Sequence, residues 1–305
     1  MFKRCLPKSY KKQNASKTTS KTALTRHRLI KLVKRIHIGT GGYGDNDLIG
    51  VLYPHNARPN DFLHHYANHY DCVEINSSFH APIGQKTVQG MFAKADKRLK
   101  FSFKLHQDFS HARTATAQSA KNFLHILTPF SKQLAPLLLQ FPHSFERTIT
   151  NRRYLGEMAT WFDGHLLAIE FRHPSWHVDP VFAHFAKSPN LIWVNADYPK
   201  NIGLPNTPFW ANARTAYYRL HGNNPRWWDE KTAKERHDHR YSDDELSKIA
   251  DEIFANRQYF DELFIYFQNT TNAHSFYNIV MLKEKLARLG FETKLPCLRG
   301  QGSLF

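Results

Sequence analysis

The stretch LLAIEFR, residues 166–172, shows the pattern on which the fold of this chain depends. A short apolar run ends there in Glu170 and Arg172, two positions apart. Successive side chains of a strand point to opposite faces, so residues i and i+2 share one face. The stretch therefore predicts a buried strand that directs an acid and a base the same way at its C-terminal end.

Similar apolar runs recur along the chain, with stretches of helical spacing between them. With the first one included, the eight runs are Ile36–Thr40, Cys72–Asn76, Phe101–Leu105, Pro136–Phe141, Leu166–Phe171, Leu191–Asn195, Tyr217–His221 and Leu263–Phe267. The helical stretches are 59–70, 85–97, 117–132, 148–162, 178–187, 242–257 and 271–289. Because strand and helix alternate over about 255 residues, we predict an α/β fold, a single TIM-like (β/α)8 barrel. An open doubly wound sheet is the alternative, although GTGG at residues 39–42 matches its Gly-rich phosphate turn poorly.

The charge of the chain is concentrated at one end. Residues 1–35 hold 12 Lys and Arg and no acid, whereas the remainder holds 30 basic against 26 acidic residues. We expect a basic, disordered extension over residues 1–35, a barrel over 36–290 and a C-terminal tail over 291–305. Electrostatic binding of nucleic acid by the extension is one alternative, and a targeting segment is another.

Length and composition narrow the class of protein. The 305 residues are 41% hydrophobic, enough for one large core. No apolar run approaches the ~18 residues typical of a membrane span, so we expect no membrane partner. Three cysteines without CxxC spacing, namely Cys5, Cys72 and Cys297, favour a reducing, cytoplasmic location.

Polar residues that end the strands are the candidate site. The carboxyl ends of barrel strands form the active-site mouth, and further pairs at i and i+2 follow other runs. They are Glu74 and Asn76, Lys104 and His106, Asn195 and Asp197, and Arg219 and His221. We predict Glu74, Glu170 and His221 as catalytic residues, because carboxylates and imidazole transfer protons. The alternative for Glu74 is a structural salt bridge, for which Lys104 on the next strand is a candidate.

Cations at the same mouth predict a small anionic ligand, phosphorylated or carboxylated. Arginine forms a fork that matches such groups. The predicted substrate-binding residues are Asn76, Lys104, Arg172, Arg219, Asp197, Asn269, Trp176 and Tyr53. We predict no cofactor and no metal site, because clustered cations oppose metal binding, and a divalent metal at the strand-end acids is the less favoured alternative.

These strand ends also resemble the motifs of the DUF72 (YecE-like) family. The matching segments are Ile38–Thr40, Leu52–Pro54, Val73–Phe79, Phe101–Lys104, Leu138–Pro142, Glu170–Trp176, Tyr218–Gly222, Tyr241–Ser242 and Tyr266–Asn269. The resemblance covers about residues 36–290 and implies a TIM-like barrel, but it supplies no reaction. The chain departs from the family motifs at Gly41, Tyr43, Ala81 and Gln268, which implies an altered ligand or a weakened activity.

Three functional hypotheses follow. The first is an enzyme that performs acid/base chemistry on a small anionic substrate at the barrel mouth. The second is a protein that binds or processes nucleic acid, supported by the basic extension and the Arg-, Trp- and His-containing segment 222–241. The third is a ligand-binding barrel without catalysis. The sequence predicts neither the substrate nor the oligomeric state.

Overall fold

The computed structural model describes residues 34–200 and 202–293, and these hold eight strands in the predicted places. They are β1 (Arg35–Thr40), β2 (Cys72–Ile75), β3 (Lys100–Phe103), β4 (Leu137–Gln140), β5 (Leu167–Glu170), β6 (Leu191–Asp197), β7 (Thr215–Leu220) and β8 (Glu262–Phe267). All the ladders between them are parallel. The apolar runs thus located every strand of the described chain.

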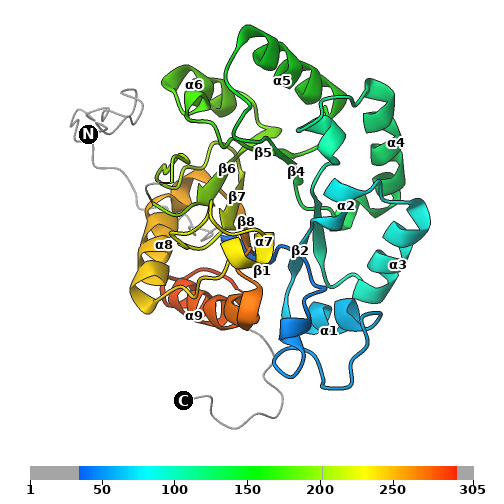
Figure 1. Ribbon diagram of the computed structural model, residues 1–305, viewed down its shortest axis with the longest axis vertical. Coiled ribbons are helices and arrows are strands. Elements are labelled where there is room, and N and C mark those ends of the chain that lie inside the picture. The colour runs from blue at the N-terminus through cyan, green and yellow to red at the C-terminus, as the bar shows by residue number, and fades with distance from the viewer. Residues whose placement is uncertain (1–33, 201, 294–305) are drawn as a thin grey trace, which may run out of the picture.

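Helices follow most strands and surround them (Figure 1). They are α1 (Phe62–His69), α2 (Ser77–His80), α3 (Gln85–Ala95), α4 (Ala117–Leu127), α5 (Ile149–Trp161), α6 (Asp179–Ala186), α7 (Ala233–Arg236), α8 (Asp243–Ala255) and α9 (His274–Arg288). Short 3-10 segments are η2 (Asn46–Leu48), η3 (Gln107–Phe109), η4 (Thr128–Gln133), η5 (Pro174–Trp176), η6 (Arg257–Tyr259) and η7 (Thr271–Ala273). The four-residue helices α2 and α7 were not predicted, because one turn is too short to show an apolar period.

The hydrogen-bonded ladders join the strands into two sheets, and the continuous eight-stranded barrel that we expected is not shown. One sheet has the order β1-β8-β7-β6-β5-β4, and β2 pairs with β3 in the other. Isolated bridges span the two seams: Gly41 to Glu74 between β1 and β2, and Phe101 to Leu134 and Lys104 to Leu138 between β3 and β4. What is shown is therefore an α/β fold with a mainly parallel sheet, and the seams fall where the strands are only four residues long.

Gly39 lets β1 lie against β2 at the first seam. A Cβ atom built on Gly39 would lie 2.0 Å from the backbone oxygen of Cys72 and 2.8 Å from the hydroxyl of Tyr66. Any side chain at this position would force the two strands apart. The Tyr66 hydroxyl fills the same space from α1 and donates to the Cys72 oxygen at 3.0 Å.

The inward face of the strands carries apolar residues below polar ones. Leu138, Ala168 and Tyr217 belong to one buried cluster, and each stands two positions before a polar residue of the same strand. A larger cluster contains the apolar residues of the helices that cover the strands. Because residues i and i+2 share a face, the polar residues at the strand ends lie directly above this inner apolar layer.

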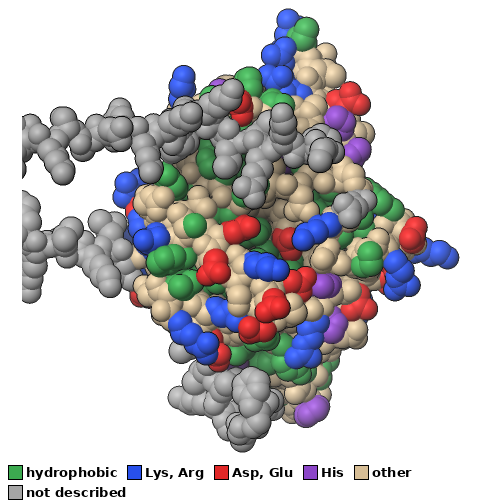
Figure 2. All heavy atoms as spheres, turned by 90° about the vertical axis from the view of Figure 1, so that its left-hand side faces the viewer, with side chains coloured by type: hydrophobic (Ala, Val, Ile, Leu, Met, Phe, Trp, Pro, Cys, Tyr) green, Lys and Arg blue, Asp and Glu red, His purple; other side chains and the backbone are tan. Residues whose placement is uncertain are grey.

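The ends of the chain bear on two of the predictions. The described fold begins slightly before the predicted boundary, because Lys34 pairs with Asp261 at 2.8 Å and Arg35 opens β1. The predicted extension up to residue 33, and residues 294–305 of the predicted tail, lie outside the described residues. Among the residues that are described, no helix is long and apolar enough to cross a membrane. Acidic and basic side chains intermingle on the face drawn in Figure 2.

Candidate functional site

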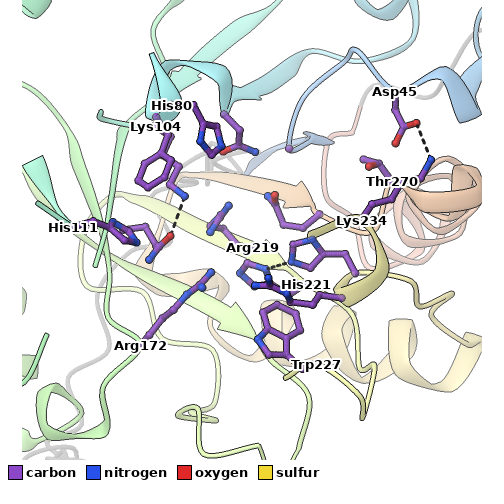
Figure 3. Close-up of a pocket in the computed structure, with 17 residues that line it drawn as sticks. Asp45, His80, Lys104, His111, Arg172, Arg219, His221, Trp227, Lys234 and Thr270 are labelled. Atoms are coloured by element: carbon purple, nitrogen blue, oxygen red, sulfur yellow. Dashed lines mark hydrogen bonds and ion pairs between the residues drawn. The ribbon is translucent and has the colours of Figure 1, made fainter. Parts of the chain in front are cut away.

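A cavity of about 430 Å³ opens over the carboxyl ends of the strands. Its wall comes from the ends of most strands and from the segments that follow β1 and β7 (Figure 3). The lining residues are Gly41, Asp45, Asn76, Phe79, His80, Lys104, His111, Gln140, Arg172, Arg219, His221, Trp227, Lys234, Arg236, His237, Gln268 and Thr270. The parallel topology thus brings together residues that lie up to 229 positions apart, between Gly41 and Thr270.

Arg219 forms the floor of this cavity, and the buried Glu74 binds its guanidinium group. The Arg219 guanidinium donates to both oxygens of Glu74, at 3.0 Å from Nε and 2.8 Å from Nη2. Glu74 accepts two further hydrogen bonds, from the hydroxyl of Tyr217 at 2.7 Å and from Nε2 of Gln268 at 3.1 Å. Glu74 is fully buried and does not line the cavity, so its carboxylate orients Arg219 instead of facing a ligand. The salt-bridge alternative for Glu74 holds in this geometry, with Arg219 as the partner in place of Lys104.

Glu170 connects the floor to the wall. Its carboxylate accepts from Nη1 of Arg219 at 2.5 Å, from Nε of Arg172 at 3.0 Å and from the hydroxyl of Tyr198. Burial alone would raise the pKa of Glu170, but Arg219 and Arg172 hold it well below the usual range. The same pairing, against the effect of burial, raises the pKa of Arg219. Glu170 therefore stays ionised and fixes two guanidinium groups.

Arg172 presents unused donors to the cavity. Its side chain is 21% exposed, and its Nε atom is the one that contacts Glu170. Its terminal nitrogens, Nη1 and Nη2, make no hydrogen bond with any part of the chain that the structure describes. A planar fork with free N–H groups is suited to a carboxylate or phosphate.

Lys104 also lines the cavity. Its ammonium nitrogen donates to Oε1 of Gln140 at 2.9 Å and lies 4.1 Å from the centre of the Phe79 ring. Burial and the nearby charges of Arg219 and Arg172 lower the pKa of Lys104 to about 7. A pKa near 7 suits proton exchange at neutral pH, a role that we predicted for Glu74, Glu170 and His221 and not for Lys104.

Three histidines of the cavity, His111, His221 and His237, are neutral at physiological pH. Burial and Arg219 lower the pKa of His221 well below its usual value, and burial together with Arg172 and Arg219 lowers that of His237 to about 3. Nδ1 of His221 lies 3.3 Å from Nε2 of His237, so one of the two rings donates to the other. Nε2 of His221 is buried without a hydrogen-bond partner among the described residues and lies 3.9 Å from a Glu170 oxygen. Burial and Lys104 lower the pKa of His111 to about 4.

Two predicted ligand-binding residues lie beside the cavity and not in its wall. Asp197 accepts a hydrogen bond of 2.8 Å from the Tyr241 hydroxyl, whose oxygen accepts at 2.7 Å from the backbone N–H of Gly222. Asn269 donates to the backbone oxygen of His239 at 2.8 Å. Both side chains therefore hold the two ends of the segment after β7, which forms part of the cavity wall.

Two predicted aromatic residues belong to the apolar core. Tyr53 donates to the backbone oxygen of Tyr43 at 2.6 Å and stacks on Phe62. Trp176 donates to the backbone oxygen of Phe145 at 2.7 Å and packs with centroid spacing of 4.5 Å against Phe171. Neither lines the cavity at the strand ends. The other predicted ligand-binding residues, Asn76, Lys104, Arg172 and Arg219, do.

Sequence reasoning missed several residues of the site. Tyr217 stands two positions before Arg219, so the face rule that identified His221 applies equally to it. His237 lies in the segment 222–241, which we noted for its Arg, Trp and His residues, but nothing distinguished it there from its neighbours. Tyr198 follows directly after β6 and carries no spacing signal.

The residues of the cavity do not form a recognisable metal centre. Within residues 34–200 and 202–293, no group of three or more His, Cys, Asp and Glu side chains is placed to hold a metal ion. The carboxylates of Glu74 and Glu170 are engaged by guanidinium groups. The absence of a metal stays a prediction.

Comparison with known proteins agrees with the motifs. The model of the family "Protein of unknown function DUF72" matches residues 37–298. The chain is 28% identical over 255 residues to the UPF0759 protein YunF of Bacillus subtilis, covering 77% of this chain and 89% of that protein.

Two solved structures extend the comparison. A DUF72 family protein of Thermotoga maritima has a TM-score of 0.75 at 27% identity, covering 83% of this chain and 99% of the other. A DUF72 family protein of Enterococcus faecalis, at 20% identity, has a similar fold with a TM-score of 0.72, covering 88% of this chain and 100% of the other. With its strand-end motifs and a family match over most of its length, this chain belongs to the DUF72 family of proteins of unknown function.

Proposed function

We propose that this protein is an enzyme that binds a small phosphorylated or carboxylated substrate and performs acid/base chemistry on it at the strand-end cavity. The observation that carries the proposal is the presence of Arg172 and Lys104 in the wall of one cavity. Arg172 offers free guanidinium nitrogens, and Lys104 offers an amine that titrates near pH 7. One group can hold an anion while the other exchanges a proton.

The charges around the cavity support this division of roles. Glu74 and Glu170 balance the two guanidinium groups, so the arginines remain in place without a ligand. Lys104 makes no ion pair with any described residue, and its charge is left for the ligand to neutralise. The proposal therefore moves the proton-transfer role from Glu74 and Glu170, which do not line the cavity, to Lys104, with neutral His221 as a further candidate.

The scaffold we propose is one TIM-like barrel, with β2 and β3 completing the ring that the six-stranded sheet begins. The isolated bridges at both seams support this reading, because each joins neighbouring strands in the order that a closed barrel requires. In that architecture, polar residues at carboxyl ends of strands converge on one mouth, as the cavity residues do here.

Sulfate keeps the same charge from pH 6 to pH 8, so any change in its binding over this range comes from the protein. Its binding therefore tests the anion site. We expect sulfate to bind the wild-type protein in isothermal titration calorimetry, and Arg172→Gln to weaken it about tenfold or more. Affinity should fall about tenfold from pH 6 to pH 8 as Lys104 loses its charge, and Lys104→Met should bind weakly with little pH dependence.

The controls identify the titrating group and the site. The other titratable or charged groups at the cavity are Asp45, Glu74, His80, His111, Glu170, Arg172, Arg219, His221, Lys234, Arg236 and His237. His80 is an exposed histidine of the cavity wall, and His80→Gln tests whether it causes the pH dependence. If Lys104 is the cause, this variant should show the same pH dependence as wild type. Arg153→Gln changes an exposed arginine that does not line the cavity and should bind as wild type does. Equal binding by wild type and Arg172→Gln would contradict the anion site.

Catalysis needs a separate test. Wild type, Lys104→Met and Arg172→Gln would be incubated with a mixture of phosphorylated and carboxylated metabolites, and the mixture followed by mass spectrometry. Consumption of a compound by wild type alone would support an enzyme. Sulfate binding without any conversion would favour the ligand-binding barrel instead.

A further inference from the structure

We propose that Lys104 is an amine nucleophile that forms a Schiff base with the carbonyl group of an anionic substrate. The inference rests on the proposed anion site and names the bond that would form there. It follows from the place of this amine in the cavity, the groups that surround it and the donors that face it.

The position of Lys104 distinguishes it from the other lysine of the cavity. Lys234 is paired with Asp47 at 2.8 Å and lies 3.9 Å from Asp45. Lys104, at the end of β3, pairs with no carboxylate of the described chain and contacts the neutral amide of Gln140. Figure 3 shows its side chain directed into the same space as Arg172 and Arg219.

The surroundings of Lys104 favour the neutral amine, which is the reactive form. The side chain is largely buried, and the fixed guanidinium groups of Arg172 and Arg219 oppose a third positive charge. The Phe79 ring covers one side of the amine and also packs edge-on against His111, with ring centres 4.9 Å apart. With a pKa of about 7, roughly half of Lys104 is neutral at physiological pH.

The reaction balances with the groups present. The lone pair of Nζ forms a bond to the carbonyl carbon, and the electrons of the broken C=O π bond go to oxygen, which takes up a proton that leaves the nitrogen. The hydroxyl then takes a second proton from the solvent and leaves as water, and the nitrogen lone pair forms the protonated C=N bond. The protonated product carries the same single charge as the lysine ammonium, so the charge balance with Glu74 and Glu170 is preserved. Neutral His111, beside Phe79, is a candidate to carry the proton.

The cavity also indicates the class of carbonyl compound. Arg172 would take its phosphate or carboxylate, and about 430 Å³ accommodates a small molecule. Oδ1 of Asn76, a residue of the cavity wall, is a buried acceptor without a hydrogen-bond partner in the described chain. A substrate hydroxyl would satisfy that acceptor. We therefore infer a hydroxylated ketone or aldehyde that bears an anionic group.

Reductive trapping tests the inference on the full chain. Dihydroxyacetone phosphate and pyridoxal 5′-phosphate would be incubated separately with the protein and sodium cyanoborohydride, and the labelled lysines identified by peptide mass spectrometry. We expect labelling of Lys104 to exceed that of exposed Lys121 about tenfold or more, and to fall in Arg172→Gln and with added sulfate. Lys104→Arg, with circular dichroism to verify folding, should lose the dominant label.

The outcomes separate this inference from the proposed function. Dominant, sulfate-sensitive labelling of Lys104 by either compound supports the Schiff base. Labelling of Lys104 no greater than that of Lys121 by both compounds, in a protein that still binds sulfate through Arg172, overturns it and leaves the anion site in place. If sulfate binding is also missing, both proposals are wrong.

Discussion

At the scale of single residues, the buried ion pairs at the cavity floor should have a measurable effect on the free energy of unfolding. Arg219 is 3% exposed and satisfies two carboxylates at once. Removal of one partner from a buried ion pair leaves the other charge uncompensated, which costs more than the pair itself contributes. The floor should therefore tolerate substitution far less well than ion pairs at the surface.

We predict that Arg219→Met lowers the free energy of unfolding by about 3–5 kcal/mol, because Glu74 and Glu170 lose their shared partner. Glu74→Gln should cost less, since an amide still accepts hydrogen bonds. Urea denaturation at pH 7 would measure both. Arg214→Met is the matched control, because Arg214 is 82% exposed although paired with Asp261, and it should cost less than about 1 kcal/mol. Equal losses for the two arginines would show that the floor is not a coupled buried network.

The shifted pKa of Lys104 predicts a second effect of substitution, this time a gain in stability. The folded-state pKa of about 7 lies below the unfolded value near 10.4, so between these pH values the unfolded chain binds more protons. The contribution of Lys104 to stability thus improves as pH rises from 7 to 10. Lys104→Met should be more stable than wild type at pH 7, on the order of 2 kcal/mol, with the difference shrinking towards pH 10. A pH-independent difference in urea denaturation would contradict the shift.

How far the sequence predicts the site also depends on single residues. The rule that residues i and i+2 share a face brought Glu74, Glu170, Arg172, Arg219 and His221 to one end of the molecule. It could not tell which polar ends would find partners of their own. Asp197 and Asn269 are engaged by other protein groups, a matter of three-dimensional contact that no spacing encodes. The same limit hid the surroundings of Lys104, whose pKa is lowered by burial and by Arg219 and Arg172 from distant parts of the chain.

At the scale of elements, apolar runs and helix caps in the sequence indicate where strands and helices lie. Nothing in the sequence indicates where the hydrogen-bonded ladders between strands break. A capping box between Ser242 and Glu245, a spacing that can be read in the sequence, is present at the start of α8. Strand positions followed from composition, because a buried strand is apolar whatever its partner. The breaks in the ladder beside β2 and β3 depend on how short strands end against their neighbours, and apolar patterning does not report this.

We predict that the β1–β2 seam is the most sensitive place for a small substitution. Gly39→Ala should lower the melting temperature strongly or prevent folding, because its methyl group would overlap the Cys72 oxygen. Gly44→Ala is the control: no atom lies within 4 Å of the added methyl group, and it should change stability by less than about 1 kcal/mol. Differential scanning calorimetry of both variants tests the seam. Similar melting temperatures would mean that the strands can separate without loss.

At the scale of the whole molecule, the chain has two separate candidates for binding anions, and they can be told apart. The cavity suits a small molecule, while the 12 basic residues among residues 1–35 suit a polyanion. Outside that segment, basic residues exceed acidic ones by only four. The second functional hypothesis, nucleic-acid binding, therefore depends mainly on residues that the structure does not describe.

Deletion of residues 1–33 should abolish binding of single-stranded RNA or DNA while leaving sulfate binding unchanged. Full-length protein should bind with a steep dependence on salt concentration, since each neutralised phosphate releases a counterion. Fluorescence anisotropy at two salt concentrations would measure this. Nucleic-acid binding that survives the deletion would place that site on the described fold, and the exposed Trp228 in the segment after β7 would be the first residue to examine.

The reactivity of the Cys72 thiol can report how often the seam between β1 and β2 opens. Its thiol is fully buried in β2 beside the point where Gly39 meets the Cys72 oxygen, and burial raises its pKa well above the usual value. In a variant with Cys5 and Cys297 replaced by serine, a thiol-specific dye would react only when β2 is released. The rate of the dye reaction would then measure how often β2 is released from the fold. A substrate analogue that stabilised the cavity would lower this rate.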